Sequence, residues 1–140
     1  QNSIFKVRRY QKYLWGLEEE ISASSGGVAD FELAAGSQYA GRKYLLLGSL
    51  SGTTPGTWVT LGLNVPLNRD SFTNYILAHL GGASFSGFQG TLDSFGMASA
   101  TLDTLGPIPA GMVGNTAHFS FLTTSPVDFS ANAVGILIQP

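Results

Sequence analysis

Apolar residues recur with two different periods along this chain, and the period changes near residue 18. Within residues 1–17, spacings of three and four place several side chains on one helical face: Val7, Tyr10, Leu14 and Leu17. We therefore predict a short helix here. The same stretch is rich in β-forming residues, so an extended strand over residues 4–13 is the alternative.

Beyond residue 18, alternating positions and short apolar runs predict about eight or nine strands separated by turns. We expect residues 17–23 and 28–33 to form a hairpin through the turn at residues 24–27. Further strands are predicted at Tyr44–Leu50, Trp58–Leu63, Phe85–Leu92, Met97–Leu102, Thr116–Thr123 and Ala131–Ile138. Residues 71–80 fit both a helix and a strand, and their strand neighbours favour the strand. No helix pattern recurs between strands, so we predict an all-β, antiparallel, immunoglobulin-like sandwich.

Two short segments near the middle of the chain resemble each other. Residues 91–96 (TLDSFG) and residues 101–106 (TLDTLG) each end an apolar run with an aspartate and close with a glycine. Aspartate and glycine favour turns for different reasons, because aspartate binds nearby backbone and glycine accepts a positive φ. We interpret the pair as two strand ends with similar turns.

Charge distinguishes the N-terminal arm, residues 1–17, from the β domain, residues 18–140. The first 20 residues hold four of the seven basic side chains and three of the nine acidic ones. Charged residues make up only 11% of the whole chain, against roughly 25% in typical soluble domains. The net charge of −2 argues against nucleic acid as the partner.

An aromatic, basic arm attached to a nearly neutral domain suggests a segment that packs on another copy. We predict that the protein forms a homo-oligomer or polymer through this arm. The expected subunit-interface residues are Phe5, Val7, Tyr10, Tyr13, Leu14, Trp15 and Leu17.

Residues that could carry chemistry are few. Cysteine is absent, which excludes disulfides and thiolate nucleophiles. His79 and His118 lie in apolar or turn contexts that favour structural roles, and most of the carboxylates adjoin predicted turns. We predict no catalytic residue, no cofactor and no metal site. Trp58, Tyr39 or Tyr75 could stack on a cell-surface glycan, which is the alternative to assembly.

The β domain also resembles a known module. The run AGRKYLLLGSLSGTTPG at residues 40–56 carries the resemblance, supported by residues 65–70 (VPLNRD), 92–98 (LDSFGMA) and 132–134 (NAV). Residues 22–140 thereby resemble a small β-sandwich module at the C-terminal end of many secreted multidomain bacterial proteins. The resemblance implies export and an immunoglobulin-like sandwich, and it implies no catalytic residues.

These expectations combine into one functional hypothesis. The chain begins at Gln1 and not at methionine, which we interpret as a mature form that has lost an export signal. Its apolar runs are much shorter than the about 20 residues of a membrane-spanning helix. We expect a secreted or cell-surface, non-enzymatic structural subunit that forms a filament or sheath. The alternative is a carbohydrate-binding or adhesion module.

Overall fold

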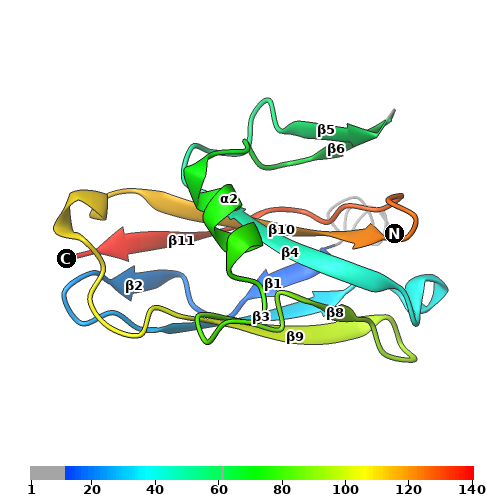
Figure 1. The fold of residues 1–140 in the computed structure, drawn as a ribbon, viewed down its shortest axis with the longest axis horizontal. Helices are drawn as coiled ribbons and strands as arrows, with labels where there is room; N and C mark the ends of the chain where they lie inside the picture. Colours follow the sequence, from blue (N-terminus) through cyan, green and yellow to red (C-terminus); the bar gives the residue numbers. More distant parts are fainter. Residues whose placement is uncertain (1–11, 61) are drawn as a thin grey trace, which may run out of the picture.

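The computed structural model describes residues 12–60 and 62–140 of the chain (Figure 1). It is mostly β, with 44% strand and 11% helix, and its sheets are predominantly antiparallel. The all-β sandwich predicted from the sequence is therefore confirmed. Residues 1–11, which include Phe5, Val7 and Tyr10 of the predicted interface, lie outside the described residues.

Two sheets face each other. The first has the order β1 (Leu14–Gly16), β3 (Val28–Ala34), β9 (Met97–Asp103) and β7 (Phe85–Ser86). The second has the order β2 (Glu20–Ser22), β11 (Val134–Gln139), β10 (Thr116–Thr124), β4 (Lys43–Ser49) and β8 (Gln89–Thr91). Within these two sheets neighbouring strands are antiparallel, except for β2 and β11, which run parallel.

The core lies between the two sheets and is rich in phenylalanine. Alternation along β3 turns Phe31 and Leu33 inward, and alternation along β10 does the same for Phe119 and Phe121. Phe31 and Phe119 come from opposite sheets, and their ring centroids are 4.9 Å apart. This contact joins the two layers directly, as expected for aromatic pairs in a close-packed interior.

Strand β1 corrects the predicted division of the chain. Leu14 pairs with Leu33 of β3 and is fully buried, so the sandwich begins before residue 18. A helix is wrong for residues 14–16. The side-chain oxygen of Asn132 accepts hydrogen bonds from the backbone N–H groups of Tyr13 and Leu14, and its Nδ2 donates to the Leu14 carbonyl. With β3 on one side and Asn132 on the other, an extended backbone satisfies its polar groups here.

The predicted hairpin of residues 17–33 is also wrong. After β1 the chain crosses to the other sheet, where β2 pairs with β11, and only then returns to form β3. The single predicted strand over residues 85–92 divides in the same way, because β7 pairs with β9 while β8 pairs with β4. Two short strands that belong to different sheets resemble one continuous strand in the sequence, because both contribute apolar residues to the same core.

Residues 71–78 form helix α2 (Ser71–Ala78), not the strand we favoured. Asp70 accepts hydrogen bonds from the N–H groups of Phe72 and Thr73, and the Thr73 hydroxyl accepts one from the Asp70 N–H. This capping box starts the helix. Ile76 is buried in the core, and the Thr73 hydroxyl donates to the Gly48 carbonyl of β4 at 2.7 Å. The helix thus covers the part of β4 that β8 leaves unpaired.

The predicted strand over residues 58–63 is instead a hairpin of β5 (Thr57–Thr60) and β6 (Leu63–Val65). Gly62 at its tip has a φ of 86°, a conformation that favours glycine. Figure 1 shows this hairpin projecting from the sandwich on the side of the five-stranded sheet. A second small apolar cluster beneath it contains Val65, Leu67 and Leu122.

Candidate functional site

The outer face of the four-stranded sheet carries two carboxylates side by side on β3. Asp30 and Glu32 alternate with the buried residues of that strand and so point away from the core. On the neighbouring strand, Thr101 donates a hydrogen bond to Asp30 at 2.8 Å. Ser99 lies 3.0 Å from both carboxylate oxygens of Glu32. We call this surface the acidic face.

Two of the predicted interface residues lie on the acidic face. Trp15 pairs with Glu32 across β1 and β3 and is 39% exposed. Leu17, whose N–H donates to the Asp30 carbonyl, is 59% exposed. Together they place an accessible apolar patch beside two carboxylates on one sheet.

The other described members of the predicted set do not lie there. Leu14 is part of the core, so its assignment to a subunit interface is wrong. Tyr13 is half-buried and packs edge-on against Phe129 of its own chain, with ring centroids 5.0 Å apart. The sequence pattern could not separate these roles, because the apolar positions of β1 also fit helical spacing.

Charge is distributed unevenly between the start of the chain and the remainder. The first twelve residues hold four of the seven basic side chains and no carboxylate, and the rest of the chain holds all nine carboxylates. Arg42 pairs with Asp128 at 2.7 Å, Lys43 belongs to β4, and Arg69 precedes α2. Within residues 12–60 and 62–140, neither Asp30 nor Glu32 forms an ion pair with a basic side chain.

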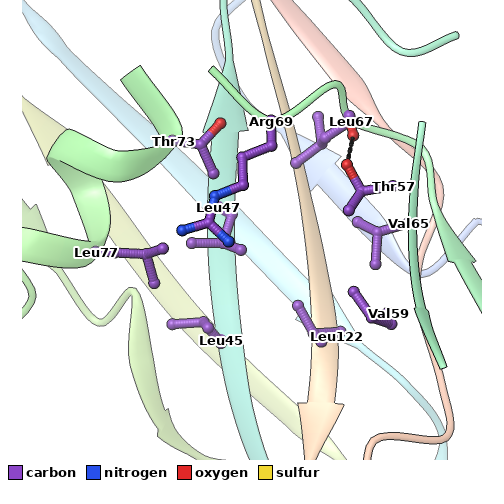
Figure 2. Close-up of a pocket in the computed structure, with 10 residues that line it drawn as sticks. All are labelled: Leu45, Leu47, Thr57, Val59, Val65, Leu67, Arg69, Thr73, Leu77 and Leu122. Atoms are coloured by element: carbon purple, nitrogen blue, oxygen red, sulfur yellow. Dashed lines mark hydrogen bonds between the residues drawn. The ribbon is translucent and has the colours of Figure 1, made fainter. Parts of the chain in front are cut away.

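A groove lies between the β5–β6 hairpin, α2 and the five-stranded sheet (Figure 2). This groove has a volume of about 210 Å³. Its apolar floor comes from Leu45 and Leu47 of β4 and Leu122 of β10. Arg69 extends over it, and its Nε donates to the side-chain oxygen of Asn74 at 2.9 Å. The groove combines apolar contact with one cation, and its lining contains no carboxylate, histidine or serine.

The aromatic residues proposed for glycan stacking are dispersed over three elements. Trp58 of β5 is 66% exposed. Tyr75 of α2 is 52% exposed and stacks on His79, with centroids 4.0 Å apart. Tyr39 of the 3₁₀ turn Ser37–Tyr39 is half-buried against Phe129. Trp58 is thus the most accessible of the three for stacking on a sugar ring.

The two histidines occupy positions without a nucleophile beside them. The Nδ1 atom of His79 lies 2.7 Å from the Tyr75 carbonyl at the C-terminal end of α2. His118 lies on β10, half-buried, and its Nδ1 makes no hydrogen bond to the described residues. Neither ring is hydrogen-bonded to a serine or threonine hydroxyl in this part of the chain, as a nucleophile and base would require.

Asp93 and Asp103 stabilise loops. Asp93 accepts from the N–H groups of Phe95 and Met97, and Asp103 accepts from that of Leu105. The two similar turns predicted at residues 93–96 and 103–106 are confirmed by this shared bonding pattern. Across residues 12–60 and 62–140 no three His, Asp or Glu side chains gather as metal ligands would.

Asp70 has the most perturbed carboxylate. Partial burial raises the pKa of Asp70, but hydrogen bonds from Thr73, Leu50, Ser51 and Ser49 outweigh it and lower that pKa to about 2. Its Oδ2 accepts from the N–H groups of Leu50 and Ser51 at 2.8 and 2.9 Å. Asp70 thus connects the end of β4 to the start of α2. The sequence analysis did not predict this structural role.

No protein-family model matches the chain, and no curated protein shows detectable sequence similarity to it. Among the described residues, no helix is long and apolar enough to cross a bilayer. The surfaces described above are therefore the basis for any functional assignment.

Proposed function

We propose that the protein is an exported, non-enzymatic structural subunit that assembles through its N-terminal arm. The observation that carries this proposal is the charge segregation. Four basic side chains precede residue 13, while Asp30 and Glu32 lie beside the exposed Trp15 and Leu17 on the acidic face. Opposite charges with an apolar centre are the usual composition of a complementary interface.

The attachment point of the arm favours a neighbouring copy as its partner. Tyr13 is held at the sandwich edge by Asn132 and by Phe129, which both belong to the connection between β10 and β11 of the five-stranded sheet. Tyr13 therefore lies at the edge where the two sheets meet, whereas the acidic face lies on the outside of the first sheet. Contact between the arm of one copy and the acidic face of another is head-to-tail, because it joins two different surfaces. Such contacts form a closed ring when the rotation between copies closes, and otherwise a filament.

The proposal is tested by reversing charge on each side in the full-length chain. We expect the unmodified protein to assemble, as measured by multi-angle light scattering and negative-stain microscopy. Arg8→Glu with Arg9→Glu should give monomers, and so should Asp30→Lys with Glu32→Lys. Combining all four substitutions should restore assembly, because the charges are again complementary.

Glu20→Lys is the matched control, because Glu20 is an exposed carboxylate on β2 of the other sheet. It changes the net charge without touching the acidic face and should leave assembly intact. Assembly of the Arg8/Arg9 variant at wild-type concentration would contradict the proposal.

A second candidate function, carbohydrate binding or adhesion, is favoured by the exposure of Trp58. A glycan array probed with the full-length chain tests it. Selective binding that Trp58→Ala abolishes and Phe95→Ala preserves would support this function, because Phe95 is similarly exposed but lies in a turn. An array without selective binding would exclude the glycan classes it contains.

A further inference from the structure

An apolar cavity of about 460 Å³ lies between the two sheets at the end of the sandwich where β9 is followed by the loop 104–115. Its lining is drawn from both sheets, α2 and this loop. Principal contributors are Leu50, Phe72, Leu102, Ile108, Met112 and Phe119. Ligand pockets in proteins typically enclose about 300–1,000 Å³ and are lined mainly by apolar side chains. The cavity fits that range and composition.

The loop that borders the cavity is fixed at both of its ends. The Ile108 N–H donates to the Ala23 carbonyl at 2.8 Å, and the Gly114 N–H donates to the Ile138 carbonyl at 2.9 Å. Between these bonds the 3₁₀ turn Ala110–Met112 places Met112 against the cavity. The space is therefore preformed by bonded backbone, which reduces the conformational entropy lost on binding.

The polar groups of the lining indicate which ligands the cavity accepts. The hydroxyl of Thr104 is occupied, because it donates to the Gly106 carbonyl and accepts from the Gly27 N–H. Asp103 is the only charged residue in the lining, and no lysine or arginine contributes. An anionic group would lose its hydration near a carboxylate with no cation to compensate.

We propose that this cavity binds a neutral apolar molecule, such as an alkyl chain or a compact ring system. A volume share of about 30 Å³ per water-sized group gives space for roughly ten to fifteen non-hydrogen atoms. The lining is apolar and open to solvent on one side, so an apolar ligand would displace water from it, which is favourable. The ligand needs at most one hydrogen-bonding group, which the Ser84 side of the lining can meet.

The two methionines make this inference testable in the intact chain. Met112 lines the cavity, while Met97 lies on the acidic face and is 43% exposed. With ¹³C-methyl methionine labelling, n-decanol should shift the Met112 signal in a saturable manner and leave that of Met97 unchanged. Decanoate should bind at least about tenfold more weakly, because its carboxylate would be desolvated without a counter-charge.

Two substitutions that fill the cavity, Ala117→Leu from β10 and Ile108→Trp from the loop, should each abolish the response to n-decanol. Ala40→Leu, at an exposed position after the 3₁₀ turn Ser37–Tyr39 and away from the cavity, is the control and should retain it. A Met112 signal that does not respond to n-decanol in the wild-type chain overturns the proposal. Equal shifts at Met97 and Met112, or binding that survives both substitutions, would also overturn it.

Discussion

Asp70 shows how much of this fold depends on single polar side chains. One carboxylate oxygen caps α2, and the other accepts from the backbone where β4 ends. The sequence does contain a signal for the cap, because Asp70 and Thr73 have capping-box spacing. The strand patterns on either side nevertheless favoured a strand. The second set of bonds has no sequence signal, because Leu50 and Ser51 are distant from Asp70 along the chain.

Asp70→Asn should lower the free energy of unfolding at neutral pH. It should also make that free energy depend less on pH in the acid range. Since the folded pKa of about 2 lies below the ordinary value of 3.8, the ionised carboxylate stabilises the fold above about pH 4, and this contribution is lost as pH falls toward 2. Asparagine can still cap the helix, so the loss, about 1 kcal/mol, comes from weakening the charge-assisted hydrogen bonds that Asp70 accepts. Urea unfolding of both proteins at pH 7, 4 and 2 measures the difference, which should shrink on acidification. A difference that grows toward pH 2 would contradict the assignment, and exposed Glu20→Gln provides the control.

At the scale of elements, alternation located most strands but not their partners. Tyr44–Leu50 was predicted as a buried strand and corresponds to β4, whose position between β10 and β8 explains its unbroken apolar run. Sheet membership of β1, β2, β7 and β8 could not be predicted, because these strands have only two or three residues each. For so few residues, period two and period 3.6 are barely distinguishable.

Strand β1 gives a test of where the folded domain begins. Leu14→Ala should destabilise the protein by about 2–5 kcal/mol, because it removes a fully buried side chain from the core. Leu17→Ala, three residues later on the exposed face, should change the unfolding free energy by less than about 0.5 kcal/mol. Urea unfolding monitored by tryptophan fluorescence measures both. Equal effects of the two substitutions would show that β1 does not belong to the folded sandwich.

At the scale of the whole molecule, composition predicted the class correctly. Abundant glycine, low charge and short apolar runs indicated an all-β sandwich, and the structure has one. The acidic face and the apolar cavity were not predictable, because each depends on residues that only the strand register brings together. Asp30 meets Thr101 through the pairing of β3 with β9, and the cavity brings Leu50 and Ile108 together although they are distant along the chain.

Salt should distinguish the two proposed interactions. Raising ionic strength from 0.1 to 1 M shortens the Debye length from about 10 to about 3 Å. Assembly through the basic arm and the acidic face should therefore weaken, as measured by light scattering at fixed protein concentration. Binding of n-decanol in the cavity involves no charge pair and should not weaken. Assembly that strengthens with salt would indicate an interface dominated by apolar contact.

The parallel pairing of β2 with β11 has a mechanical consequence. Tyr13 lies beside Asn132, just before β11 begins, whereas Pro140 follows the far end of that strand. A pull applied through Tyr13 and Pro140 would slide β2 and β11 past each other lengthwise. Their hydrogen bonds would then bear the load together and not open one after another, so the sandwich is built to resist tension along its length.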